Sequence, residues 1–332
     1  MLSAIAATLA IVALGYVLKQ RNFLPDSVWQ AMSPLCYWVL FPGLLFDLMS
    51  KMELSANFIG PFTAAIVAGS AVAILYALFA GRIAGLGGAS LSSLVQGSLR
   101  HNGFLVLSIL QGAVGVAAVK VAAIAIAFLV PISNIVSVLA ILTLTGSGER
   151  RSMKSAVLSE IARNPLLAAM LVGVGVNWLE LPVPAFIAQA AALLGEGALP
   201  LLLLSIGASL KFSAFRGHAV PLGLAFMAKM LVFPAALVGA GYWLGLDTLA
   251  LVVLAAVGAA PTANSTYTLA VELGGDAPLM AEILSLQTVC AAVSMPLWIW
   301  LAGRLLGGLV ASVDQITPIC MLSLAGGVIW SL

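Results

Sequence analysis

The sequence contains very little charge. Lys, Arg, Asp and Glu make up only 8% of its 332 residues, whereas 62% of the residues are hydrophobic. A soluble protein of this size could not cover its surface with so few polar side chains, so the composition excludes an ordinary soluble globule and indicates a chain that lies in a lipid bilayer. The polar stretches between the apolar runs are too short for a separate soluble domain, and we expect no nucleic-acid partner.

Residues that build catalytic and metal sites are also scarce. The two histidines, His101 and His218, are far apart in the sequence, and the three cysteines lie in apolar runs without the spacing of a metal or redox site. Asp47 is the only aspartate within the apolar runs, so the facing aspartate pair of an intramembrane protease is missing, and no serine has an obvious histidine partner. We therefore expect neither an enzyme nor a bound cofactor or metal.

Long apolar runs, by contrast, follow one another along the whole chain. A membrane-spanning helix needs about 20 mostly apolar residues. Ten such stretches are present: 2–19, 28–50, 57–80, 88–116, 119–144, 159–178, 184–210, 219–244, 249–274 and 277–306. The sequence therefore predicts an all-α integral membrane protein with ten transmembrane helices. The tail 309–332 is a further hydrophobic segment, and its uncharged stretch 315–332 is 18 residues long, which is only just enough for another span.

The distribution of Lys and Arg predicts the orientation in the membrane. With the N-terminus outside, the cytoplasm receives nine loop cations: Lys19, Arg21, Arg82, Arg150, Arg151, Lys154, Arg163, Lys211 and Arg216. Three lie outside: Lys51, Lys120 and Arg304. This excess agrees with the positive-inside rule, so we expect a multi-pass protein of the cell (inner) membrane with a cytoplasmic connector at 145–158.

That connector separates two similar halves, residues 1–144 and residues 159–308. The stretch "FPGLLFDLMSKMEL" resembles "LPLLLLSIGASLKF", which matches Pro42 with Pro200 and predicts a helix kink at each. Likewise "NGFLVLSILQG" aligns with "NSTYTLAVELG". Each half contains five spans, and an odd number means that the second copy enters the membrane upside down. This is the inverted-repeat arrangement of secondary transporters.

Two of the ten spans are interrupted at matching places. The fourth span contains "RHNG" at 100–103, and the ninth contains "AAPTANST" at 259–266. Gly103 and Pro261 are expected to break the helices, and Asn102 and Asn264 are the matched amides at the two breaks. Each second half-helix then begins near the middle of the membrane and presents free N–H groups there. Two such ends predict a site for an anion.

The other polar residues at the breaks are candidates for substrate binding. Arg100 can hold a carboxylate with its planar guanidinium, or it can simply complement the dipole at the end of a half-helix. A histidine ordinarily titrates in the range that a proton-coupled cycle needs, which makes His101 a candidate proton carrier. The two asparagines can bind substrate, cap the following half-helices, or do both. The remaining candidates are Thr262, Ser265 and Thr266.

Two further charges lie deep in the predicted spans. Glu196 is in the seventh span and Lys229 in the eighth. The sequence leaves two interpretations open: the two residues form a structural ion pair, or Glu196 carries a coupling proton.

Several stretches together resemble the auxin efflux carriers, which include plant proteins and PIN-like bacterial permeases. The resemblance covers roughly residues 1–308 and depends on five motifs: "GYVLKQRNFLPDSVWQAMSPLCYWVLFPGLLF", "RHNGFLVL", "RNPLLAAMLVGVGVN", "ALPLLLLSIGASL" and "PTANSTYTLA". It implies two inverted five-helix repeats, with spans 1, 2, 6 and 7 as a dimerising scaffold and the other spans as a moving transport domain. It further implies crossed, broken helices 4 and 9 around an organic-anion site, and elevator-type alternating access. Plant members have a proline at both breaks, whereas this chain has Gly103 in the first.

The sequence thus predicts a homodimeric secondary active transporter of a small organic anion, namely a mono- or dicarboxylate such as malonate, malate or an auxin-like acid. Three alternatives remain: a sodium-coupled bile-acid-type symporter, a sodium/proton antiporter of related fold, and a substrate sensor that does not transport. Antiporters usually rely on acidic residues at the crossover, and this crossover has none.

Overall fold

A computed structural model describes residues 2–52, 56–146, 164–209 and 218–305 of the chain. All secondary structure in these ranges is helical, which confirms the predicted all-α class for the described part. Most of the basic connector and the whole tail 309–332 lie outside the described residues, so the predictions made for them stay predictions.

The helices follow the predicted apolar runs closely. The first half contains α1 (Leu2–Gln20), α2 (Asp26–Leu35), η1 (Cys36–Leu40), α3 (Phe41–Ser50), α4 (Ala56–Ile83), α5 (Gly88–Leu99), α6 (Gly103–Ala113) and α7 (Val116–Leu144). The second half contains α9 (Pro165–Trp178), α10 (Ala185–Ser209), α11 (Ala219–Met227), η3 (Ala228–Val232), α12 (Phe233–Trp243), α13 (Thr248–Ala259), α14 (Ser265–Leu273) and α15 (Ala277–Leu305).

Six helices or continuous helical runs of the described residues are long and apolar enough to cross a membrane. They are Asp26–Ser50, Phe58–Ile83, Val116–Leu144, Ala185–Ala208, Ala219–Trp243 and Ala277–Arg304. Of the other four predicted spans, two are interrupted by the breaks. The first corresponds to α1 (Leu2–Gln20), and the sixth is described from Asn164 onward, with α9 at Pro165–Trp178. A multi-pass membrane protein follows from these helices, and the number of ten spans stays a prediction.

Two of the long runs contain a π-helical turn directly before a proline. In η1 the N–H of Phe41 donates to Cys36 O, five residues back, and Pro42 follows. In η3 the N–H of Phe233 donates to Ala228 O, and Pro234 follows in the same way. A proline has no N–H and its ring crowds the preceding turn, so the helix widens there. Pro200, the other predicted kink, lies inside α10, which is helical from Ala185 to Ser209.

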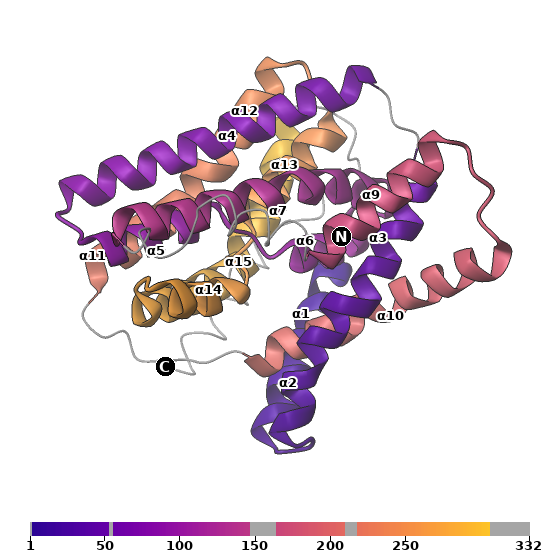
Figure 1. Cartoon of the computed structure of the whole chain (residues 1–332), viewed down its shortest axis with the longest axis horizontal. Helices are drawn as coiled ribbons and strands as arrows, with labels where there is room; N and C mark the ends of the chain where they lie inside the picture. Colours follow the sequence, from indigo (N-terminus) through magenta and orange to yellow (C-terminus); the bar gives the residue numbers. More distant parts are fainter. Residues whose placement is uncertain (1, 53–55, 147–163, 210–217, 306–332) are drawn as a thin grey trace.

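The described helices form two groups that lie side by side (Figure 1). In the first group α1 and α3 pack on α10, and α3 also packs on α9. In the second group α4 packs on α5 and α12, α13 packs on α12 and α15, and α5 packs on α7. The groups meet where α6 contacts α1 and α10, and where α7 contacts α3 and α9.

Glycines set the closest helix contact within the first group. A Cβ atom added at Gly15 of α1 would overlap Leu204 O of α10, and one added at Gly207 of α10 would overlap Val12 O of α1. The backbones of α1 and α10 therefore touch directly, as small residues allow in membrane helix pairs.

Candidate functional site

The two helix breaks lie against each other. Arg100 ends α5 with φ −63° and ψ 146°, and Ala260 ends α13 with φ −66° and ψ 142°, so the chain leaves both helices in the same extended conformation. Between the two segments, the N–H of Asn102 donates to Pro261 O at 2.7 Å. The interruptions predicted from Gly103 and Pro261 are thus present and in contact.

The second break is longer than the first. Three residues, 100–102, separate α5 from α6, whereas five residues, 260–264, separate α13 from α14. The offset between the halves is therefore 160 at the end of the first half-helices (260 minus 100) and 162 at the start of the second ones (265 minus 103). The two extra residues lie inside the break itself.

A cavity of about 560 Å³ adjoins the breaks and lies between the two helix groups. Six of the nine predicted substrate-binding residues line it: Arg100, His101, Asn102, Gly103, Asn264 and Ser265. Its mouth, meaning the exposed part of the lining, is formed by Pro34 and Trp38 on one side and by Asn264, Ser265, Thr268 and Glu272 of α14 on the other.

The other three predicted residues, Pro261, Thr262 and Thr266, are buried and do not line the cavity. The hydroxyl of Thr262 lies 2.6 Å from Gln287 Oε1 and 3.1 Å from Gly97 O, and so faces the interior of the second helix group. Thr266 is fully buried, and its hydroxyl has no partner among the described residues. Thr262 is directed toward Gln287 and Thr266 lies on the buried side of α14, so nearness in sequence overestimated the number of residues at the cavity.

Arg100 connects the two breaks through its side chain. It is 7% exposed, and its Nη2 donates to Ser265 Oγ at the start of α14, at 2.9 Å. His101 beside it is also buried, and neither of its ring nitrogens has a hydrogen-bond partner among the described residues. A guanidinium and two helix beginnings, at Gly103 and Ser265, therefore meet at one wall of the cavity and make that wall electropositive.

The two matched asparagines behave differently. Asn102 is buried, and its Oδ1 accepts a hydrogen bond from Leu105 N at 3.2 Å, so it caps α6. Asn264 makes no such cap bond to α14, and it is exposed at the mouth of the cavity. Of the two roles that the sequence left open, capping therefore applies to Asn102 and not to Asn264.

Glu196 and Lys229 do not form the ion pair considered from the sequence. Lys229 is fully buried in η3, its Nζ lies 4.5 Å from the centroid of the Phe233 ring, and it has no hydrogen-bond partner among the described residues. Glu196 is exposed on α10 of the first helix group. The two side chains thus belong to different helix groups, a separation that the sequence positions do not reveal.

Several cavity residues were not predicted. Four are aromatic, namely Tyr37, Trp38, Phe41 and Phe104, and six are polar, namely Ser133, Asn134, Asn164, Ser205, Thr268 and Glu272. The polar ones carried a usable signal, because an amide within an apolar span, such as Asn134, usually faces a cavity or a partner. Asn164 caps α9 by accepting from Leu166 N at 3.0 Å and Leu167 N at 3.3 Å. Nothing in the sequence distinguishes the aromatic four from lipid-facing residues.

No group of three or more His, Cys, Asp and Glu residues that could hold a metal ion occurs within the described ranges. A family model described as "Membrane transport protein" matches residues 72–299, about two thirds of the chain. An "Uncharacterized transporter" of Methanothermobacter thermautotrophicus is 25% identical over 298 residues, which cover 89% of this chain and 96% of that protein.

Proposed function

Because the chain belongs to the membrane transport protein family, the family of the auxin efflux carriers, we propose that it is a secondary active transporter of a small organic anion that works by elevator-type alternating access. The observation that carries the proposal is the pair of touching helix breaks beside a cavity. Discontinuous helices that begin at a cavity between two helix groups are the binding-site arrangement of secondary transporters.

The charges at the cavity favour an anion. Arg100 lies at the break, and the helices α6 and α14 both begin in the lining, so their free N–H groups add partial positive charge. Glu272 is the acidic residue of the lining, and it lies at the exposed mouth, away from the start of α14. A carboxylate placed next to Arg100 would receive charge-assisted hydrogen bonds.

The apolar part of the lining narrows the class of anion. Tyr37, Phe41 and Phe104 contribute aromatic surface, and Leu107 and Ile206 contribute aliphatic surface. Such a wall suits a monocarboxylate with an apolar body, like an auxin-like acid, better than malonate or malate, whose second carboxylate would lose its hydration there.

The contacts between helices support two repeats that are related by pseudo-symmetry. If the halves are swapped, the contact of α1 with α10 becomes that of α9 with α3, and both occur. In the same way the contacts of α4 with α5 and of α5 with α7 correspond to those of α12 with α13 and of α13 with α15. We take the two repeats as inverted, with ten spans, because each half contains five predicted spans. In this proposal the first helix group is the scaffold of a homodimer and the second group moves.

The exposed mouth suggests the side to which the cavity opens. With the N-terminus outside, the loop before α2 and the end of α14 both lie in the cytoplasm, and the mouth residues Pro34 and Glu272 lie toward these ends. In this structure α6 packs against α1 and α10 on the opposite side. In this proposal the carrier lies in the inner membrane and is open to the cytoplasm.

A ligand screen with the purified protein tests the anion site. We expect phenylacetate and indole-3-acetate to raise the Tm more than malonate or malate, and neutral phenylacetamide to have no effect. A ligand at 100 times its Kd stabilises the folded state by about 2.7 kcal/mol. Equal shifts with the acid and its amide would show that the site does not select anions.

Transport itself requires a second measurement. Liposomes that contain the protein and are loaded with unlabelled phenylacetate should take up labelled phenylacetate from outside by exchange. Binding without exchange would identify a sensor, and exchange that requires sodium would favour the sodium-coupled alternative.

A further inference from the structure

The second helix break is held in place by a side chain that does not touch the cavity. Gln287 lies in the middle of α15 and is fully buried. Its Oε1 accepts hydrogen bonds from Thr262 N at 3.1 Å and from Thr262 Oγ1 at 2.6 Å. Both the backbone and the side chain of the second break are thus bound to one amide oxygen.

The nitrogen of the same amide binds two other helices. Nε2 of Gln287 donates to Gly97 O of α5 at 2.9 Å and to Ala225 O of α11 at 3.3 Å. Gly97 lies in the last turn of α5, where carbonyl groups lack a helical N–H partner because the helix ends at the first break. Ala225 lies in the last turn of α11, where the helix passes into the π-helical turn η3.

The amide of Gln287 therefore uses its full hydrogen-bonding capacity at three backbone irregularities. A glutamine amide has two N–H donors and an oxygen that accepts two bonds, and all four are used here. A carboxylate at this position would lose both donors, and an aliphatic side chain would leave buried polar groups of Thr262, Gly97 and Ala225 without this partner. The close packing of α5 against α15 also requires a glycine at position 97, since a Cβ there would lie 2.8 Å from Cγ2 of Ile283 in α15.

We propose that Gln287 is a positioning residue for the substrate site: by holding Thr262, it fixes the second break relative to the end of α5, and so sets the distance between Arg100 and Ser265 across the cavity wall. This inference rests on the proposed function, because the arrangement that Gln287 maintains is the anion site. It also makes Thr262 a link in that arrangement and not a contact of the substrate.

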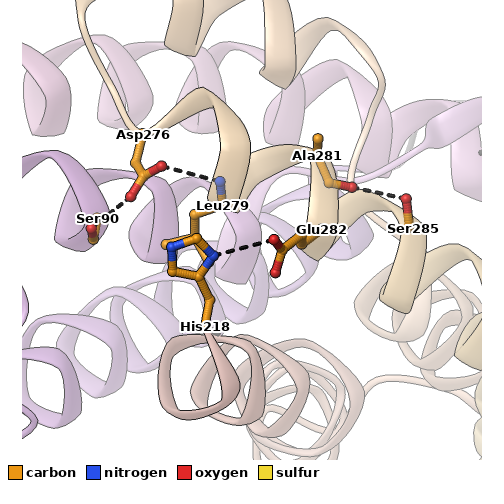
Figure 2. Close-up of polar contacts among 7 residues, drawn as sticks. All are labelled: Ser90, His218, Asp276, Leu279, Ala281, Glu282 and Ser285. Atoms are coloured by element: carbon orange, nitrogen blue, oxygen red, sulfur yellow. Dashed lines mark hydrogen bonds and ion pairs between the residues drawn. The ribbon is translucent and has the colours of Figure 1, made fainter. Parts of the chain in front are cut away.

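The beginning of α15 offers a matched control (Figure 2). There Asp276 accepts a hydrogen bond from Ser90 of α5 at 2.7 Å, and Glu282 pairs with His218, the residue before α11, at 3.2 Å. These contacts connect α15 to the same two neighbours as Gln287 does, but they do not involve the second break. His218→Ala therefore removes a polar link between α15 and the start of α11 while leaving the contacts of Thr262 in place.

The test compares Gln287→Met with His218→Ala in the full-length protein, with phenylacetate as the probe. We expect Gln287→Met to weaken phenylacetate binding by about tenfold or more, and His218→Ala to change it by less than about twofold. Hydrogen–deuterium exchange of the ligand-free protein should rise at residues 260–266 in Gln287→Met and not in His218→Ala. Equal losses of affinity in both variants, or unchanged affinity in Gln287→Met, would overturn the proposal.

A milder pair of variants covers the case in which Gln287→Met does not fold. Thr262→Val removes the hydroxyl without changing the shape much, and should weaken phenylacetate binding by about threefold or more, whereas Thr262→Ser should restore it. Equal affinities of these two variants would contradict the role of the link. If the wild-type protein binds no carboxylate, the proposed function fails, and the exchange at 260–266 still decides whether Gln287 holds the break.

Discussion

Replacing each of the two matched asparagines separates a structural contribution from a binding one. The amide of Asn102 caps α6 through Leu105 N, and the same side chain lines the cavity. Asn264 lines the cavity without capping α14. Asn102→Ala should therefore lower both stability and affinity for substrate, whereas Asn264→Ala, which removes no cap bond, should lower affinity with a smaller loss of stability than Asn102→Ala.

The magnitudes follow from the contacts. Loss of an N-terminal cap costs about 1 kcal/mol, which for a chain of this size corresponds to a Tm decrease of about 2 °C. Loss of one hydrogen-bonding partner of a buried anion costs about 1–3 kcal/mol, and the middle of that range weakens binding by more than tenfold. The variant Asn102→Ser should recover the Tm, because serine is also a good capping residue, but not the affinity.

The assay is a Tm measurement in detergent combined with a Kd for phenylacetate, for the wild type, the two alanine variants, Asn102→Ser and the double variant. Affinity losses in the double variant should not add, because residues that share one ligand are coupled. A Tm for Asn264→Ala as low as that of Asn102→Ala, or normal phenylacetate exchange in liposomes by the double variant, would show that the breaks are structural and that the anion binds elsewhere.

Three further predictions concern charge and topology. Arg100→Lys should weaken phenylacetate binding by about tenfold although the charge is kept, because lysine lacks the planar two-point fork; an unchanged Kd would mean that Arg100 only complements the dipole of α5. Lys229→Met should raise the Tm by a few degrees, since it removes a buried amine that has no hydrogen-bond partner among the described residues; a lower Tm would contradict this reasoning. Cysteine labels should reach 145–158 only from the cytoplasm and positions near Asp247 only from outside, and the reverse pattern would overturn the assigned orientation.

The positions of the helix breaks could be predicted from sequence because the responsible residues are chemically distinct. Pro261 and Gly103 disfavour a continuous helix, and polar residues such as Arg100 and Asn102 are conspicuous within apolar runs. Backbone contact between the breaks then followed from the match between the halves. The helices themselves followed from runs of apolar residues, the strongest signal in the chain.

The detailed chemistry of the site could not be predicted in the same way. The two extra residues in the second break place Asn264 differently from Asn102, and an alignment of the halves does not reveal the direction of a side chain. The partners of Gln287 include the backbone carbonyls of Gly97 and Ala225. Every residue has a backbone carbonyl, so the sequence does not indicate which ones a side chain will bind. Likewise, the separation of Glu196 from Lys229 depends on which helices pack together.

The mouth of the cavity joins surfaces that must separate if the carrier moves as proposed. Trp38 belongs to the first helix group and Glu272 to the second, and both are exposed on the same opening. A molecule long enough to fill the cavity and also touch both side chains would act as a wedge that bridges the stationary and the mobile parts. Such a compound would hold the protein in one state and would not be transported. Its length beyond the cavity would determine whether it is a substrate or an inhibitor.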